Sequence, residues 1–187
     1  MAAWQRGAQM ERLRALGIPV FYSEPKHLAD IDKLGALLGK SSVAHDDTAK
    51  FTGDIADLRA FRATSAHSRV FYQVWDDPLM TLNAANVFSE VIALCGGENV
   101  FAAEKPHVPT ISTEAVLAAD PEAIVTAPDR PLPALDRWTR WPALKTVARG
   151  NLFGIDGDLI NRPTPRLALG AAQLCGDLDA ARKRRAK

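Results

Sequence analysis

The amino-acid sequence predicts an α/β fold: a parallel, helix-covered sheet forms one lobe, and a long helix joins it to an incomplete first α/β lobe. Two observations predict this. From Arg69 onward, short β-branched and aromatic runs alternate with segments of helical periodicity, which is typical of a parallel sheet. Before Arg69, apolar residues recur at helical spacing over residues 27–65, with one interruption at 39–42.

The composition is that of an ordinary globular protein. The 187 residues are 47% hydrophobic and 24% charged, and the formal net charge is +1. This balance gives no case for a nucleic-acid partner or for an anionic membrane surface. No apolar run approaches the roughly 20 residues that span a bilayer, and the first residues lack the apolar region of a secretory signal. Taken alone, these features predict a cytoplasmic or a processed chain.

The elements of the first third follow from turn residues and spacing. Residues 8–15 are expected to form a helix that ends at Gly17, and residues 18–22 a short strand. A preceding strand is expected for this unit, and most of it would lie upstream of Met1. A short helix then begins near His27. After the break at 39–42, a longer helix continues to about Ser65.

The elements of the last two thirds alternate. We expect strands over 69–75, 123–126 and 151–155, and helices over 84–94, near 135–140 and over 165–182. A further helix opens with Ser112 as its N-cap and ends at Asp120, and Gly96 and Gly97 end the helix over 84–94. The basic residues from Arg182 to Lys187 are interpreted as a solvated helix end.

No motif of the common enzyme classes is present: the sequence lacks GxGxxG, a Walker loop, GxSxG and HExxH. The two cysteines, Cys95 and Cys175, are not part of a CxxC or Cys/His cluster, which disfavours zinc. The residues alone leave open whether these cysteines form a disulfide or remain free thiols. His107, between two prolines, is either a cleft residue or a solvated loop residue.

Acidic residues follow two of the predicted strands, namely Asp76, Asp77, Asp156 and Asp158. Because loops at the carboxyl ends of parallel strands line the ligand crevice, these acids can bind a cation, act as acid and base, accept hydrogen bonds from ligand amides, or cap their loops. Trp75 ends a strand and can present a flat apolar face to a ligand, whereas Trp138 and Trp141 are expected in packing. A small α/β metal-dependent hydrolase using Asp76, Asp77 and Asp158 is the enzymatic alternative.

A set of segments in a fixed order carries a family resemblance. It comprises 69–75, 77–81, LCGGENVF at 94–101, 109–117, 120–125, and RPTPR with AAQLC between 162 and 175. In this order and spacing the set resembles the vitamin B12 (cobalamin or corrinoid)-binding proteins of ABC importers, among the helical-backbone metal receptors. The similarity covers essentially the whole chain, and LCGGENVF and RPTPR…AAQLC are its most specific parts.

The resemblance implies two α/β lobes joined by one long helix, with the ligand between the lobes. It divides the chain into a remnant of the first lobe (1–26), a helical connector including the long backbone helix (27–68) and a complete second α/β lobe (69–187). It also implies a periplasmic location and an upstream signal peptide and first lobe, so we expect a truncated form, which is alternatively a cytoplasmic product. With one wall of the cleft incomplete, we expect weaker corrinoid binding than in a two-lobe protein.

The implied function is that of the substrate-binding component of an ABC importer, which delivers a corrinoid to the membrane permease without catalysis, cofactor, bound metal, nucleic acid or direct membrane insertion. Glu114 is the implied transporter-docking residue, and Cys95 and Cys175 are the implied disulfide. Met80, Val108 and Leu159 stand where aromatic residues are expected, which leaves room for a related corrinoid. Haem or an iron–siderophore is the alternative ligand. The implied ligand-binding residues are Trp4, Trp75, Met80, Val108, Asp158, Leu159, Ile160, Asn161 and Arg162.

Overall fold

The computed structural model describes residues 8–19, 29–62, 67–127, 135–160 and 164–185. The chain divides into two compact units, residues 1–45 and 46–187. The division into 1–26, 27–68 and 69–187 that the sequence suggests stays a prediction. In the part of the chain that the structure describes, no helix is both long and apolar enough to cross a membrane.

The first unit begins with helix α1 (Ala8–Ala15), whose end is set by Gly17. Gly17 has φ +72°, a conformation that glycine adopts without steric cost. The Gly17 amide donates to the Arg14 carbonyl (2.9 Å) and the Ile18 amide to the Leu13 carbonyl (3.0 Å), which is the Schellman pattern of a helix terminus. The helix over 8–15 is therefore confirmed. Of the strand expected at 18–22, Ile18 and Pro19 are not in a strand, and 20–22 lie outside the described residues.

Two helices follow, α2 (Ala29–Leu37) and α3 (Ser41–Arg62), as the interrupted periodicity predicts. Gly39 in the connection has φ +66°, so the break has a conformational cause. A Cβ added at Gly35 would collide with the Cβ of Ala44, and this close approach requires glycine where α2 meets the start of α3.

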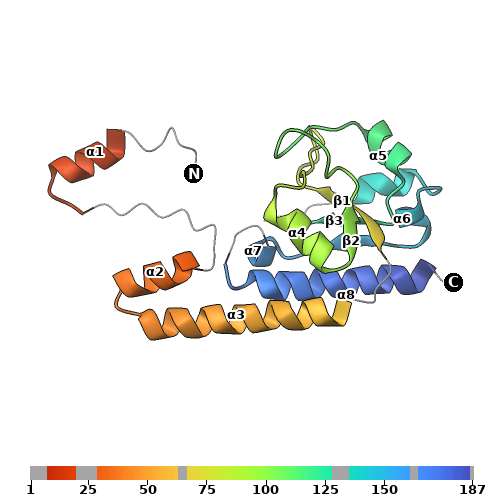
Figure 1. Cartoon of the computed structure of the whole chain (residues 1–187). Coiled ribbons are helices and arrows are strands. Elements are labelled where there is room, and N and C mark those ends of the chain that lie inside the picture. Colours follow the sequence, from red (N-terminus) through yellow and green to blue (C-terminus); the bar gives the residue numbers. More distant parts are fainter. Residues whose placement is uncertain (1–7, 20–28, 63–66, 128–134, 161–163, 186–187) are drawn as a thin grey trace. The chain divides into compact units, whose positions relative to one another are not determined.

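The second unit is built on a four-stranded sheet in the order β2-β1-β3-β4, and every neighbouring pair is parallel (Figure 1). The strands are β1 (Ser68–Gln73), β2 (Gly97–Asn99), β3 (Ala123–Thr126) and β4 (Leu152–Gly154). The predicted parallel sheet is confirmed, although β1 ends at Gln73 rather than at Trp75. Strand β2 was not predicted, because Gly97-Glu98-Asn99 has the composition of a turn.

Helices cover both faces of the sheet (Figure 1). Helices α4 (Val87–Leu94), α7 (Gly157–Ile160) and α8 (Leu167–Arg185) contribute to the core on one face, and α5 (Thr113–Ala119), the 3₁₀ helix η2 (Asp136–Arg140) and α6 (Lys145–Ala148) belong to the other. Helix α4 begins at Val87, later than predicted, because the Asn86 side chain caps it by accepting from the Phe88 amide (2.9 Å).

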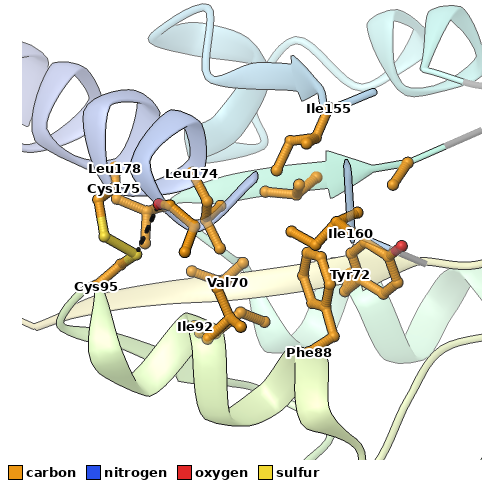
Figure 2. Packing of buried hydrophobic residues seen from close by; sticks show 14 of the residues in the cluster. Val70, Tyr72, Phe88, Ile92, Cys95, Ile155, Ile160, Leu174, Cys175 and Leu178 are labelled. Atoms are coloured by element: carbon orange, nitrogen blue, oxygen red, sulfur yellow. Dashed lines mark hydrogen bonds between the residues drawn. A yellow bond between two sulfur atoms is a disulfide. The ribbon is translucent and has the colours of Figure 1, made fainter. Parts of the chain in front are cut away.

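The core on the first face joins β1 to α4 and α8. Val70 and Tyr72 of β1 are buried there, and the Tyr72 ring stacks on Phe88 of α4 with ring centroids 3.7 Å apart. Figure 2 shows Tyr72 and Phe88 at one end of this cluster and the disulfide, near Leu178 of α8, at the other. Phe51 and Leu58 of α3 pack against the same cluster. The Cys95–Cys175 disulfide, whose Cα atoms lie 4.7 Å apart, confirms the pairing that the resemblance implied.

The core on the second face centres on an aromatic group. The Phe71 ring meets Phe101 and Trp138 edge-on, with centroid distances of 5.6 and 5.7 Å. The Trp138 indole N–H donates to the Gln73 side-chain oxygen (2.7 Å), so this amide is buried at 1% exposure with a partner. The packing role expected of Trp138 is confirmed by its complete burial.

The basic end of α8 holds the amino edge of the sheet. Arg182 donates to the Cys95 and Gly96 carbonyls (2.6 and 2.9 Å), Arg184 donates to the Gly150 carbonyl (2.5 Å), and Arg185 pairs with Glu122 (2.5 Å). These arginines are therefore tied to the backbone around β2, β3 and β4. Lys183, Arg184 and Arg185 are exposed at the end of α8, in line with the interpretation of this run as a solvated helix end. The additional contacts of its arginines, with carbonyls and with the Glu122 carboxylate, are not displayed by a sequence pattern.

Removing the disulfide should destabilise the fold. Closing a loop with a sequence separation of 80 stabilises by about 4 kcal/mol on a chain-entropy estimate. We expect the free energy of unfolding of the Cys95→Ala/Cys175→Ala variant, measured in urea, to be about 2–4 kcal/mol lower than that of the unaltered protein. Dithiothreitol should lower the urea midpoint of unfolding of the unaltered protein and leave the midpoint of the variant unchanged. Equal midpoints for the two oxidised proteins would contradict the stabilising role.

Candidate functional site

The candidate site lies at the carboxyl edge, which we define as the segments 74–83 after β1, 100–112 after β2 and 155–160 after β4. All strands are parallel, so these segments leave the sheet at the same edge. Strand β3 separates β1 from β4, which places their ends about 10 Å apart. A ligand that contacts both segments therefore has to be larger than a single small metabolite ring.

Backbone hydrogen bonds join the segments after β1 and β2. The Met80 amide donates to the Trp75 carbonyl (3.1 Å), and the Thr81 amide to the Pro109 carbonyl (3.0 Å). The Ile111 amide donates to the Leu79 carbonyl (2.9 Å) and extends the same ladder. Trp75, Met80 and the 107–111 segment are thereby held as one piece.

Large apolar side chains are exposed on this piece. Trp75 is 56% exposed, Val108 40% and Val74 38%, while Met80 is half-buried and pairs with Trp75 on one side and Thr110 on the other. In the described part of the second unit, only Leu169 is exposed besides these three among the large apolar residues. The Trp75 indole N–H donates to the Asp77 carbonyl (2.9 Å), which orients the ring. We call Val74, Trp75, Met80 and Val108 the apolar edge surface.

Two buried asparagines that the sequence analysis missed hold these loops. The Asn83 amide donates to the carbonyls of Glu104 (3.0 Å) and Lys105 (3.3 Å), and its oxygen accepts from the Ala85 amide (3.0 Å). Asn99 donates to the Leu82 carbonyl (2.8 Å) and accepts from the Phe101 amide (3.0 Å). Asn99 ends β2, which was not predicted, and Asn83 lies well past the end of β1, so the available signal was only the tendency of asparagine in turn segments to bond to nearby backbone.

The segment after β4 carries the other predicted ligand residues. Asp156 caps α7 by accepting from the Asp158 amide (2.9 Å), and Asp158 itself is exposed. Leu159 is half-buried, whereas Ile160 is only 2% exposed. The Ile160 side chain belongs to the core and anchors this segment by packing there. Asn161 and Arg162, like Trp4, lie outside the described residues.

After β1, the Asp76 side chain and the Asp77 backbone are engaged in structure. Asp76 forms an ion pair with Arg137 (2.6 Å), and Asp77 supplies the carbonyl that accepts from Trp75. Among the residues that the structure describes, no group of three His, Cys, Asp or Glu side chains could hold a metal ion. The hydrolase alternative, which needs Asp76, Asp77 and Asp158 to act together, gains no ligand set from this arrangement.

Glu114 lies in the first turn of α5, where Ser112 caps the helix by accepting from the Ala115 amide (3.1 Å). Its side chain is exposed. A hydrogen bond from its own backbone amide, and then one from the Ser112 hydroxyl, hold the pKa of Glu114 below its usual value. Glu114 is therefore an accessible carboxylate at neutral pH.

Known proteins resemble this chain in sequence. No protein-family model matches the chain. It is 34% identical over 180 residues to a vitamin B12-binding protein of Yersinia pestis, covering 92% of this chain and 63% of that protein. The chain thus spans less than two thirds of the length of the curated relatives it matches.

Two solved structures show the same fold. The periplasmic vitamin B12-binding protein BtuF of Vibrio cholerae is similar with a TM-score of 0.76 and 33% identity, over 94% of this chain and 70% of that one. The periplasmic heme-binding protein RhuT of Roseiflexus sp. RS-1 gives a TM-score of 0.77 at 22% identity, over 92% of this chain and 71% of that one. The second likeness shows the fold alone.

Replacing Asn83 should loosen the carboxyl edge. Asn83→Ala leaves the Glu104 and Lys105 carbonyls without their donor, and we expect a loss of about 1–3 kcal/mol in urea unfolding. Glu104→Ala is the matched control, because Asn83 bonds to the carbonyl of Glu104 and not to its exposed side chain. The control should stay within about 0.5 kcal/mol of the unaltered protein. Similar losses for both variants would contradict the anchoring role.

Proposed function

The chain belongs to the family of periplasmic vitamin B12-binding proteins, and on that premise we propose that it captures cobalamin or a related corrinoid for an ABC importer. The observation that supports this most is the apolar edge surface. Three of its side chains are exposed at the edge of a parallel sheet where ligands of such folds bind. Large apolar side chains exposed near one another at this edge support a role in ligand binding.

Binding would be non-covalent. The flat, largely apolar face of a corrin ring suits the exposed Trp75 ring, and Met80 adapts to an irregular apolar surface because its side chain is unbranched. Asp158 is exposed in α7, in the segment after β4, where a carboxylate would accept hydrogen bonds from the amide rim of the ligand. Trp4, Asn161 and Arg162 complete the proposed ligand set on grounds of family resemblance.

The role we propose is capture and delivery without catalysis. Of the acids that the hydrolase alternative would use, Asp76 already pairs with Arg137, and among the described residues no three such side chains are grouped to hold a metal ion. A corrinoid is also favoured over an anionic ferric siderophore, because Arg137 at this edge is engaged by a carboxylate. A periplasmic location and delivery of the ligand to a membrane permease are part of the same proposal.

Truncating Trp75 should weaken corrinoid binding. We expect Trp75→Ala to raise the Kd for cyanocobalamin by about tenfold or more in calorimetry, because an exposed aromatic anchor is lost. Leu38→Ala is the control, since Leu38 is a 73% exposed apolar side chain of the first unit outside the proposed site. The control should bind as the unaltered protein does.

The ligand class is tested with the same protein. Haemin and a ferric siderophore should bind more weakly than cyanocobalamin at equal concentration. Tighter binding of haemin, or unchanged binding after Trp75→Ala, would overturn the corrinoid proposal.

Glu114 is proposed to dock on the transporter. Glu114→Gln removes the charge of an exposed carboxylate, and we expect weaker association with a corrinoid ABC importer in vesicles, by about threefold to tenfold, with unchanged cyanocobalamin affinity. Glu90→Gln is the matched control: Glu90 is also an exposed first-turn glutamate, but it lies on α4, whose core contacts are on the other face of the sheet. Equal effects of the two variants would argue against a docking role for Glu114.

A further inference from the structure

Arg137 lies where three parts of the second unit meet. It belongs to η2, and one of its guanidinium nitrogens donates both to the Asp76 carbonyl (2.7 Å) and to the Asp76 carboxylate (2.6 Å). Another nitrogen donates to the Thr113 hydroxyl (3.3 Å) at the start of α5. Arg137 thus binds the segment after β1 and the first residue of α5 at the same time.

The position of Arg137 is fixed by its neighbour in the chain, Trp138. Trp138 is fully buried and its indole donates to Gln73, the last residue of β1. The Arg137 guanidinium also lies over the Trp138 ring, 5.5 Å from its centroid. Because Trp138 is fixed in the core, the backbone of the adjacent residue Arg137 is fixed as well, and its guanidinium has a restricted range of positions.

The contact of Arg137 with Asp76 is linked to Trp75 through the two residues that follow Trp75 in the chain, Asp76 and Asp77. Asp76, held by Arg137, follows Trp75 directly, and the next carbonyl, that of Asp77, accepts from the Trp75 indole. Met80 pairs with Trp75 in an isolated bridge, and with Thr110 on its other side. Fixing the backbone at Asp76 therefore fixes the orientation of the Trp75 ring and the place of Met80.

We propose that Arg137 is a positioning residue that preorganises the apolar edge surface and joins it rigidly to the start of α5. This rests on the proposed function, because the surface is proposed to receive a corrinoid. A preformed surface binds without an ordering cost, whereas a loop that has to be ordered by its ligand binds more weakly. Arg137 touches no ligand in this scheme; it acts through Asp76.

The test compares Arg137→Met with Arg149→Met in the ligand-free chain. Methionine keeps an apolar stem and removes the donors. Arg149 is the matched control: its side chain is 29% exposed against 28% for Arg137, and it pairs with Glu122, away from the edge. Hydrogen exchange is read at the Met80 and Ile111 amides, which form the ladder. We expect Arg137→Met to raise exchange there about tenfold, and Arg149→Met to leave it unchanged.

Affinity gives the second measurement. The Kd for cyanocobalamin should rise about fivefold in Arg137→Met, and Arg137→Lys should lie between, because lysine lacks the fork that reaches two partners. Failure of the unaltered protein to bind cyanocobalamin would refute the proposed ligand, while the exchange measurement would still decide the role of Arg137. Exchange at Met80 and Ile111 that is the same in both methionine variants overturns the positioning role.

Discussion

Strand β1 turns Val70 and Tyr72 to one face of the sheet and Phe71 and Gln73 to the other, and all four side chains are buried. A strand buried on both faces requires a helical layer on each side, and the two core clusters are those layers. The sheet faces are thereby closed to ligands. What remains accessible around β1 is the end of the strand, and this is where the apolar edge surface lies.

Much of the second unit was predictable from local signals. Apolar runs predicted β1 and β3, and Ser112 predicted the start of α5. Strand β2 was not predictable, because Gly97 lacks a side chain for a tertiary reason: a Cβ there would approach Ile92 and Leu178 too closely. Nor does periodicity reveal α7, a single turn capped by Asp156. Strand β2 thus depends on contacts that are distant in the sequence, and α7 is too short for its periodicity to be recognised.

The candidate site was predictable only where position in the chain was enough. Trp75 follows a strand, so its place at the carboxyl edge could be inferred. Asn83 and Arg137 could not be found in this way, because their partners are carbonyls or a carboxylate on segments 21 to 61 residues away. Ile160 was expected to face the ligand with its neighbours. One helical turn, however, sends adjacent side chains in different directions, and that of Ile160 points into the core.

The contrast between Trp75 and Trp138 also has an optical consequence. Trp75 is 56% exposed and Trp138 is fully buried among aromatic rings. An indole in water emits at longer wavelength and is reached by dissolved quenchers, whereas a shielded indole emits at shorter wavelength and is protected from them. Within the described part of the chain, iodide quenching would therefore act on Trp75 before Trp138. Among the tryptophans that the structure describes, Trp75 therefore contributes most to the red edge of the emission spectrum and Trp138 to the blue edge.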